Sequence, residues 1–243
     1  MGHYIATMHW NSIRERLVDN AVAILPVGAA CKEHGPHLPM QTDLLQAQWL
    51  CDQLADQYNV LIWPTVSYGF YPHFIDYAGS CSLDEETFTT MIASILQSMK
   101  KSGAKNIVIL NTGISTIDPI CEAIKSLTDH VVRLINVYSG ANYLDASKEC
   151  IEESCGGHAD EEETSIMLAM YPNLVDMSLA GKGLITEKIP GPFSASDKQN
   201  ANYAPNGIYG DPRKATSEKG QKLVKAMMID VVDNIEDLLL SSA

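Results

Sequence analysis

The chain has 243 residues, 46% of them hydrophobic, which is enough for one large domain with a substantial core, so we expect a single domain over residues 1–243. Its formal net charge of −13, without any lysine- and arginine-rich run, argues against a nucleic acid partner. No basic leader precedes an apolar run, and no apolar stretch approaches the roughly 20 residues that span a bilayer, so we expect a cytoplasmic protein without a membrane partner.

Short apolar segments alternate with longer helical patterns along the chain. The patterns predict strands at 21–27, 60–64, 106–111 and 131–138, and helices at 43–58, 84–101, 117–127, 160–171 and 217–240. The predicted strands are apolar throughout, which is typical of parallel strands covered by helices on both faces. The sequence therefore predicts an α/β fold.

One long segment, 180–212, lacks these patterns and is rich in Gly, Pro, Ser and Asn. Segments of this length without regular structure are usually functional loops or oligomer contacts, and the sequence does not distinguish the two. Ligands of doubly wound sheets bind at the carboxyl ends of the strands. We therefore expect the site in the segments that follow the predicted strands.

The segment CKEHGPHLPMQTD (31–43) follows the first predicted strand. His34 and Asp43 offer imidazole nitrogen and carboxylate oxygen, a combination that suits Zn²⁺ or Mn²⁺. In the alternative interpretation, this is a surface loop in which His34 and His37 bond the backbone and Asp43 caps the next helix. His37 is expected to brace the loop through hydrogen bonds.

A second polar cluster begins at His158 and continues into four acidic residues, 160–163. Negative charge at the start of a helix interacts favourably with the helix dipole, which explains most of this run. Helical spacing allows Glu163 to turn inward beside His158, while Glu161 and Glu162 face water. A carboxylate beside an imidazole orients the ring and raises its basicity, as a proton shuttle requires.

Four segments together resemble the creatininase, or creatinine amidohydrolase, family of metal-dependent hydrolases. In chain order they are LPVGAACKEHGPHLPMQTD (25–43), YAGSCSLDEETF (77–88), HADEEETSIMLAMYPNLVD (158–176) and GIYGDPRKATSEKG (207–220). The resemblance implies a three-layer α/β/α sandwich with a mostly parallel sheet, and a homo-oligomer. It also implies hydrolysis of a C–N bond, often in a cyclic amide, by a water molecule that the metal activates.

The resemblance also implies roles for individual residues. His34 and Asp43 match metal ligands, with Glu33 as a third ligand, in a centre that holds one or two ions of Zn or Mn. His158 and Glu163 match the residues that assist proton transfer during catalysis.

The loop before His34 departs from the family pattern because it carries one extra residue. Cys31, Lys32 and Glu33 therefore compete for the position of one family ligand, and the sequence leaves open which of them faces the site. If the loop keeps the family spacing counted back from His34, Lys32 occupies the position of this ligand. Its ammonium group would replace the charge of one cation instead of binding it.

A second departure follows the third predicted strand, where Gly113 stands in the place of a ligand histidine. Hydroxyl groups nearby suit an oxyanion or carboxylate, so Ser115 and Thr116 are predicted to position the substrate. His73, in the aromatic segment SYGFYPHFIDY (67–77), is a further substrate-binding candidate.

Two functional interpretations follow from these patterns. The first is a metal-dependent hydrolase acting on a C–N bond of a small amide or cyclic amide, with a small-molecule substrate. The second is a non-catalytic or repurposed protein of the same fold that binds a small anionic ligand or a partner subunit, which Lys32, Gly113 and Ser115 favour. No glycine-rich nucleotide motif is present, which argues against a nucleotide cofactor.

Overall fold

A computed structural model describes residues 2–19, 21–125, 127, 131–188 and 190–240. Within these residues, one sheet of five parallel strands has the order β1-β3-β2-β4-β5. Its strands are β1 (His3–Tyr4), β2 (Val22–Val27), β3 (Val60–Ile62), β4 (Asn106–Asn111) and β5 (Val131–Asn136). The four predicted strands correspond to β2 through β5.

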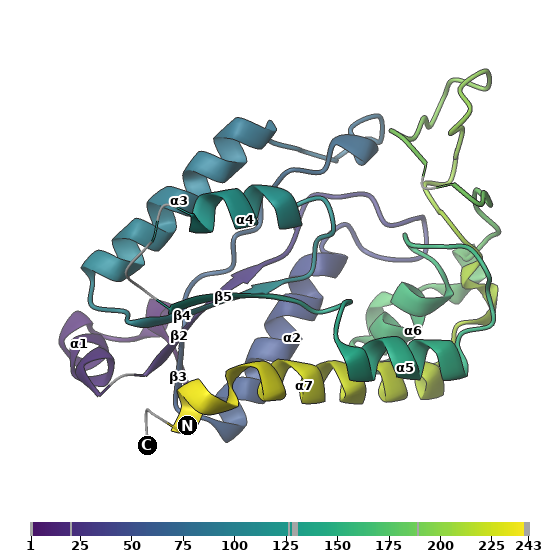
Figure 1. Cartoon of the computed structure of the whole chain (residues 1–243). Helices are drawn as coiled ribbons and strands as arrows, with labels where there is room; N and C mark the ends of the chain where they lie inside the picture. The colour runs from purple at the N-terminus through teal and green to yellow at the C-terminus, as the bar shows by residue number, and fades with distance from the viewer. Residues whose placement is uncertain (1, 20, 126, 128–130, 189, 241–243) are drawn as a thin grey trace.

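Helices cover both faces of this sheet, so the predicted three-layer α/β/α sandwich is confirmed (Figure 1). Successive residues of β2 enter opposite cores: Val22 and Ile24 pack into one, Ala23 and Leu25 into the other. The first core holds α2 (Thr42–Gln57), α5 (Ala141–Cys150), α6 (Glu161–Met170) and α7 (Ser217–Leu240). The second holds α1 (Trp10–Val18), α3 (Glu85–Lys101) and α4 (Ile117–Ile124).

Three elements have no counterpart in the sequence patterns: β1, α1 and α5. The strand is only two residues long. The two helices each bury a single side chain, Leu17 in α1 and Tyr143 in α5, and both are shorter than α2, α3 and α7. The expectation of apolar burial throughout is wrong for β5, an edge strand whose residues are mostly part-exposed.

The ends of the helices agree in part with the sequence signals. Asp84 caps α3 by accepting a hydrogen bond from Thr87 N at 2.8 Å. The interpretation of Asp43 as a cap is wrong, because α2 begins at Thr42 and Asp43 lies inside its first turn. The carboxylate of Asp43 is thereby available for other contacts.

The described residues of the segment 180–211 are irregular, as predicted, and this part of the chain runs over the end of the molecule where α5 and α6 lie (Figure 1). Among the described residues, one isolated bridge, His158 to Tyr209, attaches it to the rest of the chain, and two others, Leu184 to Tyr209 and Ser194 to Tyr203, lie inside it. Its proposed part in oligomer contacts stays a prediction. Among the described residues, no helix has the length and apolarity needed to cross a bilayer.

Candidate metal centre

The loop after β2 brings several polar side chains into the interior. Gly35 has a φ of +69°, in the left-handed region that glycine adopts without strain, and allows the chain to turn sharply after His34. The turn places the imidazole of His34 where it is completely buried, and Asp43 on the first turn of α2 is 1% exposed. Lys32 and Glu33 are buried as well.

Lys32, not Glu33, is the residue of this loop that meets Asp43. The Lys32 Nζ atom lies 2.7 Å from Asp43 Oδ2. Burial raises the pKa of a carboxyl group, but the Lys32 ammonium and the neighbouring His34 outweigh it and hold the pKa of Asp43 well below its usual range. The two groups therefore form a buried ion pair.

His34 has distinct partners at its two ring nitrogens. Nδ1 lies 2.8 Å from the backbone oxygen of Lys32, and because a carbonyl only accepts, Nδ1 carries a proton. Nε2 lies 3.0 Å from Asp43 Oδ1 and 3.7 Å from Glu163 Oε1, which are both acceptors. This geometry requires positive charge at Nε2, either a second proton or a metal ion.

The second half of the site comes from the start of α6. Asp160 caps this helix by accepting from Glu163 N at 2.9 Å, and Glu163 Oε2 accepts from Ala159 N at 2.7 Å. Ala159 has a φ of +51°, a strained value for a residue with a Cβ atom. This tight turn directs both His158 and Glu163 toward His34, whose ring centroid lies 4.9 Å from that of His158.

His34, His158 and Glu163 form a group that fits a metal ion. One ligand atom from each lies within 4.8 Å of the other two. Zinc binds nitrogen and carboxylate oxygen at about 2.0–2.2 Å, so its neighbouring ligands stand roughly 3–3.5 Å apart. The separations of 3.7 Å and 3.8 Å between Glu163 and the two imidazoles are close to that spacing. The set shares only His34 with the predicted ligands His34, Asp43 and Glu33.

His158 is held in its neutral form. Burial, together with the positive charges of Lys32 and His34, lowers its pKa well below the usual value. His158 Nε2 lies 3.1 Å from Glu33 Oε2 and donates a hydrogen bond to it. Nδ1 then carries no proton, and its lone pair faces Glu163. A neutral imidazole oriented by a carboxylate is a good metal ligand.

Glu33 contacts His158 but is not part of the metal-fitting group. Its carboxylate also accepts from Gly35 N, and Gly207 packs so closely against it that a Cβ atom there would collide. Burial raises the pKa of Glu33 to about 7. A carboxyl group with this pKa exchanges protons near neutral pH.

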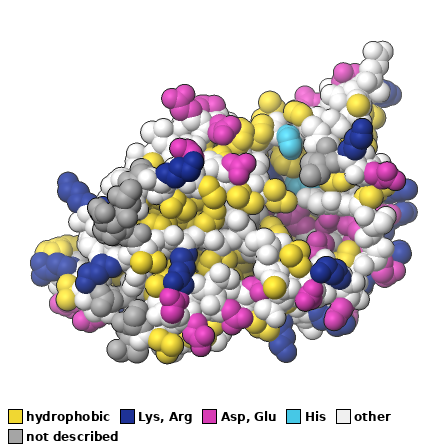
Figure 2. All heavy atoms as spheres, viewed as in Figure 1, with side chains coloured by type: hydrophobic (Ala, Val, Ile, Leu, Met, Phe, Trp, Pro, Cys, Tyr) yellow, Lys and Arg dark blue, Asp and Glu magenta, His cyan; other side chains and the backbone are white. Residues whose placement is uncertain are grey.

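An aromatic cluster covers the site. The Phe74 ring lies 4.1 Å from that of His158 and 5.5 Å from that of Phe193, and Lys32 Nζ lies 5.3 Å from its centroid. In the face shown in Figure 2, histidine atoms emerge at the right, bordered by hydrophobic side chains and, below them, acidic ones. Phe74 follows directly on the predicted candidate His73, but the aromatic character of the segment did not indicate which ring would cover the site.

The three predicted substrate-binding residues have other contacts. Ser115 Oγ donates to Phe70 O at 2.7 Å, and the buried Thr116 hydroxyl bonds Asn111 Oδ1 at 2.8 Å and Gly113 O at 2.9 Å. His73 is half-buried, and its ring contacts Phe74. Their roles toward a substrate stay predictions.

The expectation that Glu161 faces water is wrong. Its side chain is completely buried, where Oε2 accepts from Glu152 N and Glu153 N at 3.1 and 2.9 Å and Oε1 pairs with Lys219. Glu162 is half-buried. The lysine comes from α7, more than fifty residues later, which a local pattern does not reveal.

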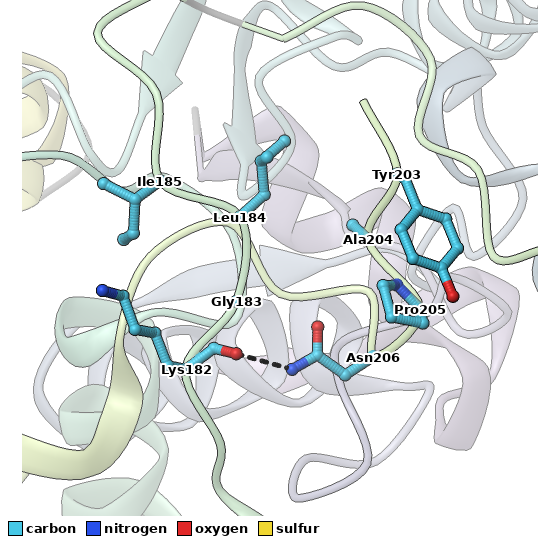
Figure 3. A pocket seen from close by; sticks show the side chains of 8 residues that line it. All are labelled: Lys182, Gly183, Leu184, Ile185, Tyr203, Ala204, Pro205 and Asn206. Atoms are coloured by element: carbon cyan, nitrogen blue, oxygen red, sulfur yellow. Dashed lines mark hydrogen bonds between the residues drawn. The ribbon is translucent and has the colours of Figure 1, made fainter. Parts of the chain in front are cut away.

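A separate hollow of about 510 Å³ lies between residues 182–185 and 203–206 (Figure 3). Asn206 Nδ2 donates to Lys182 O at 3.1 Å and joins its two walls. No histidine or carboxylate lines this hollow among the described residues. The hollow lies outside the buried group around His34. Gly207, which follows the lining residue Asn206, packs against the Glu33 side chain.

His37 braces the loop, as its pattern predicts, through a contact of 2.8 Å between Nε2 and Thr164 Oγ1. Burial lowers its pKa to about 4. In the unfolded chain the His37 ring gains a proton near pH 6.5, and in the folded protein only near pH 4. The unfolded state binds more protons between these two pH values, so the free energy of unfolding decreases as the pH falls through this window.

We expect His37→Gln to remove part of this dependence. Between pH 8 and pH 5.5 the variant should lose about 1.4 kcal/mol less unfolding free energy than the unchanged protein. Urea unfolding at the two pH values measures the difference, with replacement of the exposed His9 by glutamine as the control. An unchanged pH dependence in His37→Gln would show that this ring does not titrate as described.

Comparisons with known proteins give similar sequences over most of the chain. The Creatininase family, described as creatinine amidohydrolase, matches residues 6–235. The chain is 24% identical to the creatinine amidohydrolase of Pseudomonas putida, over 96% of each chain. It is 25% identical to the 3-dehydro-scyllo-inosose hydrolase of Thermotoga maritima, over 98% of this chain and 84% of the relative. It is 26% identical to the mycofactocin precursor peptide peptidase of Mycobacterium ulcerans, over 87% and 83%.

Solved structures share the fold. A creatininase mutant described as the Zn-Zn type superposes with a TM-score of 0.84 at 23% identity, covering 98% of this chain and 99% of the other. A structure described as creatininase Mn gives 0.81 at 23% identity, with the same coverage. Because the family match spans nearly the whole chain, the protein belongs to the creatininase, or creatinine amidohydrolase, family of hydrolases.

Proposed function

We propose that this protein is a metal-dependent hydrolase that cleaves a C–N bond of a small amide or cyclic amide. The observation that carries the proposal is the convergence of His34, from the loop after β2, with His158 and Glu163, before and inside the first turn of α6, on one buried point. His34 requires positive charge at Nε2, and His158 is neutral, as ligands of a divalent cation are.

A divalent cation in this group would supply Lewis-acid polarisation of a carbonyl and activation of water at neutral pH. The names of the solved relatives, which mention Mn and Zn, support these two metals. His34, His158 and Glu163 would hold the ion. Asp43 Oδ1, which lies 3.0 Å from His34 Nε2, would take part in ligation beside it.

The role in proton transfer that the resemblance implies for His158 and Glu163 stays a prediction, and Glu33, in contact with His158, is a further proposed proton carrier. Burial raises the pKa of Glu33 to about 7 in the metal-free protein, and a carboxyl group of this kind would accept a proton from the attacking water. The water oxygen bonds to the carbonyl carbon, its proton passes to Glu33, and the proton then moves to the departing nitrogen as the C–N bond breaks. His158, in contact with Glu33 Oε2 and near Glu163, keeps the carboxyl group in place.

The substrate is not determined by the family. The names of the three relatives specify creatinine, a dehydro-inosose and a precursor peptide, so the same family includes hydrolases with different substrates. The aromatic cover of Phe74 and Phe193 favours a small, flat substrate.

A second candidate function is a binding protein without turnover. The buried pairing of Lys32 with Asp43 favours it, because a carboxylate neutralised by lysine has less charge to offer a metal.

One experiment separates the two candidates. Protein stripped with a chelator is tested against a panel of small linear and cyclic amides, before and after addition of Zn²⁺ or Mn²⁺. Metal-dependent turnover of at least one amide supports the hydrolase. Thermal stabilisation by a ligand, with no turnover in either metal, supports the binding protein.

A further inference from the structure

The Lys32 side chain extends into the interior beside the candidate metal ligands. Its side chain is 10% exposed, and that of Asp43 is 1% exposed. Nζ lies 2.7 Å from Asp43 Oδ2, the distance of a charge-assisted hydrogen bond. A buried ammonium group remains charged only where carboxylates compensate it.

The Asp43 carboxylate lies between the Lys32 ammonium group and the His34 imidazole. Oδ2 faces the Lys32 ammonium, and Oδ1 faces His34 Nε2, the ligand atom of the metal-fitting group. The cation site on the Oδ1 side has two imidazoles and Glu163 available. On the Oδ2 side, the place that a second cation would take is already held by an ammonium group.

The neighbouring loop offers no ligand for a second cation. Residues 112–116 follow β4 and touch Asp43 through Thr112 Oγ1, which donates to the Asp43 backbone oxygen at 2.9 Å. The loop, Thr-Gly-Ile-Ser-Thr, contains no histidine, cysteine or carboxylate. The hydroxyls of Ser115 and Thr116 are bonded to other groups.

We infer that the Lys32 ammonium serves as the permanent second cation of this site, so that the chain holds a single divalent ion, between His34, His158 and Glu163. The inference rests on the proposed function, since it concerns the same metal-binding group. A second ion beside Oδ2 is repelled by the ammonium and lacks ligands. Lys32 also fixes the Asp43 carboxylate, which in turn faces His34, and is therefore a positioning residue.

The charges around Lys32 agree with this role. Nζ lies 2.7 Å from Asp43 Oδ2 and 5.3 Å from the centroid of the Phe74 ring, so an ammonium charge has favourable partners on both sides.

Metal counting on the full chain tests the inference. Protein stripped with a chelator is dialysed against excess Mn²⁺, and bound metal per chain is measured by elemental analysis. The unchanged protein should bind one ion and give the electron paramagnetic resonance spectrum of an isolated Mn²⁺. Lys32→Glu exchanges the ammonium for a ligand and should bind two ions, with the spectrum of a coupled pair. The matched control, Lys32→Met, removes the charge without adding a ligand and should bind one.

Other outcomes would contradict either the role of Lys32 or the metal-dependent function. Two ions in the unchanged protein would overturn the role of Lys32 while leaving the metal-dependent function in place. No ion in the unchanged protein would overturn both. A folded Lys32→Glu variant, verified by circular dichroism, that still binds one ion would also overturn the role of Lys32. If Lys32→Glu does not fold, the number of metal ions bound by the unchanged protein and by Lys32→Met tests the role of Lys32.

Discussion

Replacement of Glu163 by glutamine is expected to remove the bound divalent cation and to lower kcat/KM for the hydrolysed amide about a thousandfold. The carboxamide oxygen of glutamine can still accept the hydrogen bond from Ala159 N, so the start of α6 should keep its shape. The negative charge that faces both imidazoles is lost, and the remaining ligands are neutral. Elemental analysis of the purified variant and steady-state kinetics measure the two effects.

The matched control is Glu162→Gln. Glu162 lies on the same turn of α6, but its side chain interacts with Tyr143 and does not belong to the metal-fitting group. This variant should retain both its metal and its activity within a fewfold. A Glu163→Gln variant that keeps metal and activity at the level of the control would exclude Glu163 as a ligand.

Replacement of Lys32 by methionine is expected to destabilise the metal-free protein by about 3–5 kcal/mol. Methionine fills a similar volume but leaves the buried Asp43 carboxylate without its ammonium partner. For a chain of this length, each kcal/mol lowers the melting temperature by about 2–4 °C, so a decrease of roughly 10 °C should be observed. Thermal and urea unfolding in the presence of a chelator measure the loss.

A second substitution isolates the cause of this loss. In Lys32→Met/Asp43→Asn the unpaired charge is absent, so the double variant should recover more than half of the stability that Lys32→Met loses. A Lys32→Met variant within about 1 kcal/mol of the unchanged protein would show that water reaches the pair and that the ion pair is not buried in solution.

The fold was largely predictable because its longer elements carry strong periods. The buried strands β2 and β4 and the helices α3 and α7 show continuous apolar runs or helical spacing in the sequence. The elements that the patterns missed bury too little to leave a signal. They are β1, with two residues, and the helices α1 and α5, with one buried side chain each.

The site was predictable in position but only partly in its contacts. His34 and His158 were identified because one follows a strand and the other precedes an acidic helix start. Whether Lys32 or Glu33 meets Asp43 depends on the path of an irregular loop, and hydrophobic patterns carry no information about it. The contact between Glu33 and His158 joins residues 125 positions apart, so it arises from tertiary packing. In the same way, local sequence did not reveal that Ser115 Oγ bonds a backbone oxygen.

Anomalous X-ray scattering from crystals grown with Mn²⁺ or Zn²⁺, recorded at the absorption edge of the metal, locates the bound ion. We expect one anomalous peak per chain, within bonding distance of His34 Nε2, the His158 ring and the Glu163 carboxylate, and none beside Lys32. A map without a peak among these three side chains, from crystals that contain the metal, would contradict this expectation.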